Sequence, residues 1–288
     1  MITAALTILF HGLAFAMVLY IVSVGLGITM GLMNFANLAH GAFAAAGGYV
    51  VVMATRSLGL QFWVALPAAF VTVALAGAVV ERLVVRTLYG ADELRQVLFS
   101  IALLFMAIAG FTLAFGPLQQ QPEIPAALSG QVTLGGIDFP AYRAFVIVAG
   151  VTILAALWLL IGRTRMGMRI RAAVDNRNMA EAVGVDTRLL FTLTFALGTG
   201  IAGLGGGIGA DVLSITPTYG QEYLILFLIV VAVGGLGSIF GPFLAALCIG
   251  VVDVAGKYLI PEFGAFFIYG VVIAILLAKP AGFFGVRS

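Results

Sequence analysis

The chain contains several apolar stretches that are about as long as a helix must be to cross a lipid bilayer. The hydrocarbon core is about 30 Å thick, so a crossing helix needs about 20 apolar residues. Unpaired backbone groups cost too much in lipid for an irregular crossing, so these stretches must be helical. The strongest segments are residues 6–29, 62–80, 97–115, 144–161, 189–210 and 265–278. The sequence therefore predicts an all-α, polytopic transmembrane helical bundle.

Composition excludes a soluble protein. Hydrophobic residues make up 62% and charged residues 9% of the 288 residues, and the mean hydropathy is +1.18. Soluble domains carry about 25% charged residues, and a chain this apolar has too little polar surface to face water. The net charge of +2 is too small to indicate a nucleic-acid partner, and the single Cys248 excludes an internal disulfide and a cysteine metal site. We expect one membrane domain over residues 1–288, with the apolar N-terminus retained as the first span.

Two further apolar stretches do not read as single spans. Residues 34–54 begin with polar side chains and are rich in Ala and Gly, and residues 223–252 are too long for one crossing. The second stretch contains the run GGLGSIFGP at 234–242, in which glycines add flexibility and Pro242 removes a backbone donor, so we predict a helix break there. Residues 34–54 fit either an ordinary span or an element that dips into the membrane and returns. With these stretches the chain has about eight membrane elements, one or two of them broken or re-entrant.

The charges of the connecting segments predict their sides of the membrane. Segments 81–95 and 162–188 are rich in arginine, and the positive-inside rule places both in the cytoplasm. Segments 117–142 and 211–222 hold acidic residues and no basic ones, which indicates the outside. A dip at 223–252 would bring Lys279 to the cytoplasmic side, as the rule favours. The side of the N-terminus depends on how residues 34–54 cross and stays open.

The two odd stretches also predict a transport pathway. They are centred near residues 40 and 238, so we expect two related halves, and broken elements at matching places in two halves point to a transport site. Asn34, Asn37 and His40 recur every three residues and would share one face of a helix. Polar groups at membrane depth are costly and commonly face a wet pathway, although they also join helices to one another. The predicted pathway residues are Asn34, Asn37, His40, Gly235, Gly237 and Ser238.

The segment 166–183 alternates arginines and acids with apolar residues and predicts an amphipathic helix. We interpret it as a docking element for a cytoplasmic partner. The alternative is a helix lying on anionic lipid, which is common for basic amphipathic segments. The interspersed acids Asp175, Glu181 and Asp186 weigh against that alternative.

Motifs for catalysis are absent from the sequence. It contains no Gly-x-x-x-x-Gly-Lys-Ser/Thr run, so the chain has no P-loop ATPase site, and it contains neither Gly-x-Ser-x-Gly nor His-Glu-x-x-His. Ser238 with His40 or His11 would make a serine hydrolase dyad only if the fold brought them together. We therefore expect no enzyme and no metal site. A stand-alone channel or secondary transporter is the alternative of another class, although proton-coupled carriers need a buried acid and the predicted spans hold none.

Four stretches in order resemble a known family. They are GLMNFANLAHG at 31–41, continued by GGY at 47–49; GMRIRAA at 167–173 with DN at 175–176 and AVGV at 182–185; TFALG at 194–198; and VGGLGSIFG at 233–241. The whole chain is similar to branched-chain amino acid ABC-importer permeases of the LivH type. One departure is the run FSIAL at 99–103, where relatives often carry a glycine, so Ser100 is not assigned to the pathway.

The resemblance implies a multi-pass subunit in the bacterial inner membrane. It implies a second, similar permease as partner in a homo- or heterodimer, two cytoplasmic ATP-binding subunits that use ATP and Mg²⁺, and a periplasmic substrate-binding protein; this chain itself binds no cofactor. Segment 162–188 would be the coupling loop, with Arg171, Asp175, Asn176, Ala180, Glu181 and Gly184 as its coupling residues. The implied substrates are branched-chain or other apolar amino acids, and urea, short amides or other small carboxylates are the alternatives.

Overall fold

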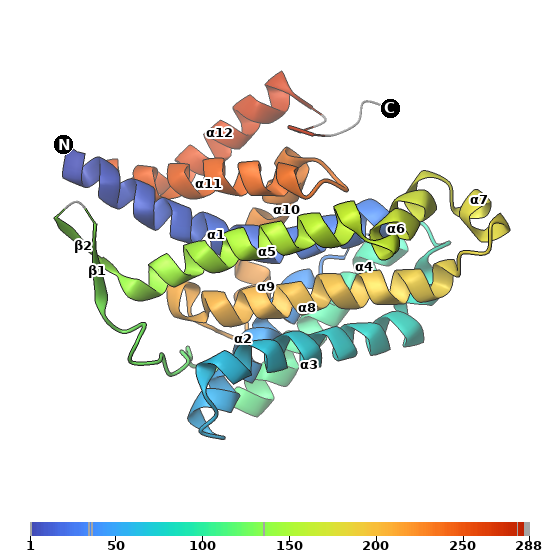
Figure 1. The fold of residues 1–288 in the computed structure, drawn as a ribbon, viewed down its shortest axis with the longest axis horizontal. Helices are drawn as coiled ribbons and strands as arrows, with labels where there is room; N and C mark the ends of the chain where they lie inside the picture. Colours follow the sequence, from blue (N-terminus) through green and yellow to red (C-terminus); the bar gives the residue numbers. More distant parts are fainter. Residues whose placement is uncertain (1, 34, 36, 135, 281, 285–288) are drawn as a thin grey trace.

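The computed structural model describes residues 2–33, 35, 37–134, 136–280 and 282–284 (Figure 1). Helices dominate the described chain, and one short antiparallel hairpin joins two of them. In chain order the elements are α1 (Ile2–Met33), α2 (His40–Arg56), α3 (Phe62–Leu83), the 3-10 helix η1 (Val85–Leu88), α4 (Glu93–Phe115), β1 (Gln131–Leu134), β2 (Ile137–Pro140), α5 (Ala141–Arg163), α6 (Arg165–Asp175), α7 (Arg177–Ala182), α8 (Thr187–Leu213), α9 (Tyr219–Glu222), α10 (Leu224–Gly234), α11 (Phe240–Leu259) and α12 (Gly264–Ala278).

Six helices of the described chain are long and apolar enough to cross a membrane, namely α1, α3, α4, α5, α8 and α11. The first five contain the first five predicted segments, and α11 lies largely within the long stretch 223–252. The segment 265–278 forms α12, which has 15 residues and is shorter than a typical span. The prediction of an all-α membrane bundle is confirmed.

The long helices run between two ends of the bundle (Figure 1). We call the end that carries η1, α6 and α7 the inner end, because both predicted cytoplasmic segments lie there, and the opposite end, with the β1–β2 hairpin, the outer end. The first helix begins at the outer end, where the Phe10 and Phe139 ring centroids are 4.3 Å apart. The last described residues lie at the inner end, where the amide of Phe283 donates to the carbonyl of Val233. This is the side predicted for the C-terminus.

Residues 34–54 form neither a full span nor a simple dip. The helix α2 begins only at His40, whose imidazole Nε2 lies 3.0 Å from the carbonyl oxygen of Val22, well inside the bundle. It ends at the outer end, where the amide of Glu123 donates to the hydroxyl of Thr55. Thus α1 reaches the inner end, the chain returns to mid-depth, and α2 completes the way out.

The stretch before α11 has the same form in the opposite direction. The short helix α9 lies against the start of α2, so closely that a Cβ on Gly41 would be 2.5 Å from the carbonyl oxygen of Gly220. From there α10 runs to the inner end, where Gly234 lies against Gly241. The break predicted between residues 234 and 242 is confirmed, because α10 stops at Gly234 and α11 begins at Phe240.

The two halves are therefore arranged as an inverted pair. The helix α1 runs antiparallel to α8, with Gly25 beside Gly198 and Val18 beside Gly209. Each long helix is followed by an element that starts at mid-depth, α2 in one half and α9–α10 in the other, and then by a span, α3 or α11. Of the two expected centres, the one near residue 40 agrees with the start of α2, whereas the one near residue 238 does not mark the matching element. The counterpart of the start of α2 is α9, because residues 235–239 form a turn at the inner end.

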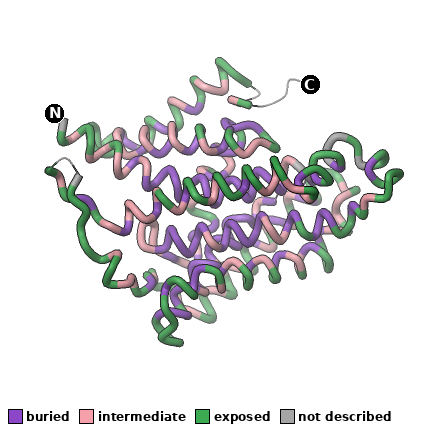
Figure 2. Tube along the Cα trace, in the orientation of Figure 1, coloured by how far each residue is buried: buried purple, intermediate pink, exposed green. Residues whose placement is uncertain are grey.

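The helix α8 is the most buried of the six long helices, and Figure 2 shows buried residues along most of its length. Its glycines face three neighbours: Gly198 meets α1, Gly206 meets α2 and Gly203 meets α3. Small residues let membrane helices approach at backbone distance, which compensates for the missing hydrophobic drive between helices in lipid. The helix α4, in contrast, has mostly exposed side chains. The core of the bundle is the set α1, α2, α3, α8 and α11.

Candidate functional site

The structure separates the residues that the sequence grouped on one helical face. Asn34 lies outside the described residues. Asn37 belongs to the irregular segment before α2, and only 2% of its surface is exposed. His40 is the first residue of α2 and is fully buried. The prediction that these residues share one face of a helix is wrong, because the chain becomes helical only at His40.

His40 joins α2 to α1. Besides the contact of its Nε2 with Val22, its Cε1 lies 3.2 Å from the place that a Cβ on Gly25 would take. The ring thus fills space that Gly25 leaves open. A polar link between helices is the alternative to pathway lining that the sequence left open. The second ring nitrogen, Nδ1, has no hydrogen-bond partner in the described part of the chain.

The turn between α10 and α11 lies away from His40. Gly237 is packed against Gly31 of α1. Val22, which contacts His40, lies nine residues earlier on the same helix, or about 13 Å along its axis. Gly235 and Gly237 have φ angles of 95° and 77°, a left-handed conformation that favours glycine. The turn and His40, which the sequence grouped as pathway residues, therefore lie at different depths.

Ser238 has a local role in this turn. Its hydroxyl oxygen accepts the amide of Gly241 at 3.0 Å and so caps the start of α11. Gly235 is buried, whereas Gly237 is exposed at the inner end. The segment is a turn between two helices, and its polar side chain satisfies the backbone of α11.

Partnerless polar atoms gather elsewhere, around mid-depth. Within the described residues, most buried side-chain atoms without a hydrogen bond lie on α1, α2, the segment before α2, or α9. We define the mid-depth polar zone as Tyr20, Ser23, Asn37, His40 and Tyr219. Tyr20 and Ser23 flank the residue that contacts His40, and Tyr219 adjoins the glycine that meets α2. An unpaired buried polar group costs about 1–3 kcal/mol, so each of these groups would gain from a polar partner.

Sequence reasoning missed three members of this zone. Tyr20, Ser23 and Tyr219 stand singly in apolar stretches, where tyrosine and serine are ordinary. No spacing signal connects them, because Tyr20 and Ser23 belong to α1 and Tyr219 belongs to α9.

The basic segment forms two short helices rather than one. Thr164 caps α6 by accepting the amide of Gly167, and Asn176 caps α7 by accepting the amide of Met179. Their apolar sides, with the first turns of α8, form a small core of their own, made of Ile170, Ala173, Ala180 and Leu190. The predicted helical, amphipathic character of 166–183 is confirmed in this divided form.

The expected coupling residues mostly shape this segment internally. A guanidinium nitrogen of Arg171 donates to the carbonyl of Ile161, and the carboxylate of Glu181 accepts the hydroxyl of Thr187. Gly184 has a φ of 86°, which suits glycine in the turn that ends α7. Asn176 and Ala180 are the cap and the core residue named above, and the Asp175 side chain lies outside the described residues.

The apolar tip of the segment points away from the bundle. Met179 is 63% exposed and Val183 is 73% exposed, both on or directly after α7. Exposed apolar side chains beside charged ones are typical of surfaces that a partner covers. These two residues were not among the predicted coupling residues, although Val183 lies within the run AVGV at 182–185.

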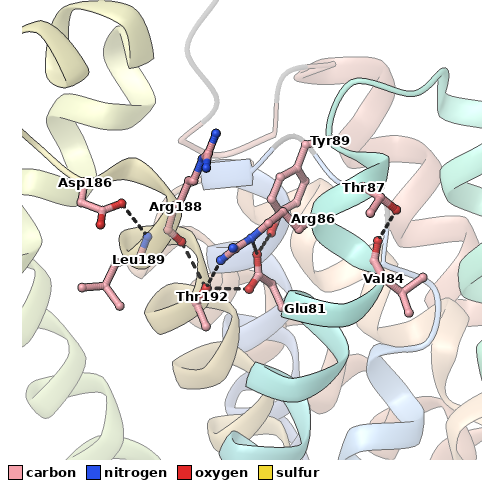
Figure 3. A network of polar contacts seen from close by, with 9 residues as sticks. All are labelled: Glu81, Val84, Arg86, Thr87, Tyr89, Asp186, Arg188, Leu189 and Thr192. Atoms are coloured by element: carbon pink, nitrogen blue, oxygen red, sulfur yellow. Dashed lines mark hydrogen bonds and ion pairs between the residues drawn. The ribbon is translucent and has the colours of Figure 1, made fainter.

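A second polar cluster, which sequence reasoning missed, lies at the inner ends of α3 and α8 (Figure 3). Glu81 is fully buried, and its carboxylate accepts the hydroxyl of Thr192 at 2.6 Å and that of Tyr89 at 2.9 Å. Arg86 Nε is 3.6 Å from the same carboxylate, and an Arg86 guanidinium nitrogen donates to the Thr192 hydroxyl oxygen at 3.0 Å. We call Glu81, Arg86, Tyr89 and Thr192 the inner network. The predicted span ended at residue 80, whereas α3 continues to Leu83 and carries Glu81 into the protein.

Comparisons with known proteins agree with this architecture. A family model described as the branched-chain amino acid transport system / permease component matches residues 8–276. The chain is 26% identical, over 97% of its length and 92% of the relative, to a probable branched-chain amino acid transport permease protein LivH of Methanocaldococcus jannaschii. It is 24% identical, over 96% of its length and 94% of the relative, to the high-affinity branched-chain amino acid transport system permease protein LivH of Escherichia coli.

A solved structure shares the fold. It is PsaBC from Streptococcus pneumoniae in complex with Fab, with a TM-score of 0.50 and 16% identity, over 96% of this chain and 95% of that one. The resemblance of the four sequence motifs is confirmed by relatives that span nearly the whole chain. Because the family model also covers most of the residues, this chain belongs to the branched-chain amino acid transport system permease family.

Proposed function

We propose that this permease provides part of the membrane pathway through which an ATP-driven importer takes up branched-chain or other apolar amino acids. The observation that carries the proposal is the relation, over nearly the whole chain, to permeases whose names give branched-chain amino acid transport. The subunit does not catalyse a reaction; it supplies the route and the conformational change.

The proposed partners follow from the division of labour within such an importer. The sequence has no P-loop, so two cytoplasmic subunits bind ATP and Mg²⁺ and hydrolyse the nucleotide. They dock on α6 and α7, where Met179 and Val183 offer an exposed apolar tip among charged residues. A second, similar permease completes the pathway, and a periplasmic binding protein delivers substrate to the outer end. The complex lies in the bacterial inner membrane.

The proposed substrate route passes the mid-depth polar zone. In the closed arrangement described here its members are buried, and their free donors and acceptors have no partner among the described residues. Separation of α2 and α9 from α1 would expose hydroxyl, amide and imidazole groups to a zwitterion. Such groups hold a substrate weakly, and weak holding allows release to the other side.

Reconstitution tests the function directly. The permease is purified with ATPase subunits, a second permease and a binding protein of this type from the same organism, and the complex is placed in liposomes. Uptake of labelled leucine, valine and urea is measured with ATP inside. We expect leucine or valine uptake that needs both ATP and the binding protein and stops with a hydrolysis-deficient ATPase. Uptake of urea instead would reassign the substrate, and uptake without ATP would identify a channel or secondary transporter.

A matched pair of variants tests the route. Asn37→Leu removes a buried amide whose Nδ2 has no hydrogen-bond partner among the described residues. Thr55→Val removes a buried hydroxyl outside the mid-depth polar zone, near the outer end of α2. We expect Asn37→Leu to lower the uptake rate at least several-fold without lowering the melting temperature of the complex, and Thr55→Val to leave uptake near the wild-type rate. Normal uptake by Asn37→Leu would remove Asn37 from the route.

A further inference from the structure

The inner network contains a fully buried carboxylate in a place where an apolar side chain would serve packing better. Glu81 has no exposed surface, and its partners come from η1, from Tyr89 directly after it and from α8. Removing a charge from water is costly, and replacing a buried ion pair by packed apolar residues is often neutral or stabilising. The inner network is therefore a poor device for stability alone. What distinguishes it is that it connects separate elements by directional bonds.

One side of the inner network leads to the docking segment. Thr192 lies in the second turn of α8, and the first turns of α8 are fixed to the end of α7. The Thr187 hydroxyl donates to Glu181, and Asp186 caps α8 by accepting the amide of Leu189 at 3.0 Å. A displacement of α7 therefore moves the start of α8, and the Thr192 hydroxyl moves with it.

The other side leads to the segment before α2. The Tyr89 hydroxyl donates to Glu81, and the Tyr89 ring packs edge-on against Phe191 of α8 and Phe35, with centroid distances of 5.5 Å and 6.4 Å. Phe35 is almost fully buried and lies two residues before Asn37. Bonds and ring contacts thus connect α8 through Glu81 and Tyr89 to the segment that enters the mid-depth polar zone.

We infer that Glu81 is a positioning residue for transport: through Thr192 and Tyr89 it sets the segment at residues 35–40 according to the position of α6 and α7. This inference rests on the proposed function, since it requires a partner that moves the docking segment. A displacement of α8 relative to α3 changes which hydroxyls reach the carboxylate. The aromatic ring of Tyr89 transmits the change to Phe35.

The test replaces the hydroxyl that links α8 to Glu81. Thr192→Val keeps the shape of the side chain and removes the bond, and Thr192→Ser restores the hydroxyl. The matched control is Thr199→Val on the same buried helix, because the Thr199 hydroxyl bonds only within α8, to the carbonyls of Phe195 and Ala196. For each complex in liposomes one measures ATP hydrolysed, substrate transported and melting temperature.

We expect Thr192→Val to retain ATP hydrolysis and thermal stability while substrate transported per ATP falls by about fivefold or more, as loss of an allosteric coupling does. Thr192→Ser and Thr199→Val should keep the wild-type ratio. An unchanged ratio in Thr192→Val would overturn the inference, and so would a parallel loss of stability, hydrolysis and transport, which indicates packing only. Absence of ATP-driven uptake by the wild-type complex would instead remove the proposed function, and the inference with it.

Discussion

A backbone contact between α2 and α8 predicts a large effect of one methyl group. A Cβ on Gly47 would lie 2.0 Å from the carbonyl oxygen of Gly203 and 2.3 Å from its Cα and carbonyl carbon. All three are backbone atoms of a buried helix, so no side chain can rotate away. Gly47→Ala therefore forces the two helices apart at their crossing.

The cost follows from the distances. Ordinary contact begins near 3.4 Å, so the helices must separate by roughly 1.4 Å, and a gap of even 1 Å forfeits up to about half of the dispersion energy across a contact. Overpacking of a core costs about 1–3 kcal/mol, and the rigid neighbour favours the upper value. The better helix propensity of alanine offsets about 0.5–1 kcal/mol of this cost. The net loss is about 2 kcal/mol, or about 4–8 °C in melting temperature at about 2–4 °C per kcal/mol.

The assay is thermal unfolding of the purified permease in detergent. Gly110→Ala is the matched control, because Gly110 is an exposed helical glycine of α4 whose added Cβ would meet no atom within 4 Å. We expect the control to melt at or slightly above the wild-type temperature and Gly47→Ala to melt several degrees below it. Equal melting temperatures for the two variants would refute the backbone contact between α2 and α8.

Three further predictions concern the ends of the bundle. Gly184→Asp should uncouple ATP hydrolysis from uptake, because aspartate is strained at a φ of 86° and the turn after α7 must shift. The measurement is substrate transported per ATP in liposomes, and a wild-type ratio would contradict the prediction. In a chain without Cys248, single cysteines that replace Gln131 or Ala5 should react with an impermeant thiol reagent from the outside. A cysteine that replaces Asn178 should react only from the inside. Labelling of the cysteine at position 5 only from the inside would contradict the position of α1. Ser238→Ala should lower stability by about 1 kcal/mol through loss of the cap on α11, and a thermal shift below about 1 °C would disprove that role.

Features that depend on local chemistry were predictable from the sequence. The five spans from α1 to α8 follow from apolar length, and the break before α11 follows from glycines and Pro242 in one short run. The helical character of 166–183 follows from its pattern of charges and apolar residues. In each case the residues that determine the structure are neighbours in the chain.

Features that depend on distant partners were not predictable in this way. The start of α2 at His40 requires the space beside Gly25 and the contact with α9. Glu81 directly follows an apolar run and reads as a loop residue, yet the bond with Thr192, 111 residues later, holds it inside the protein. A single sequence contains no signal for either pairing, since each side chain is ordinary in its own neighbourhood.

The meeting of α2 and α10 has an electrostatic consequence. Both helices begin near mid-depth, where Leu224 at the start of α10 packs with Ala39 and Ala42 at the start of α2, and they run to opposite ends of the bundle. A helix carries about half a positive elementary charge at its N-terminus, and the low dielectric of the membrane screens it little. Two such termini raise the potential at the centre of the bilayer. Cations are therefore disfavoured, and anionic groups favoured, where α2 and α10 begin, so the proposed pathway would oppose the leak of protons and sodium ions at this depth.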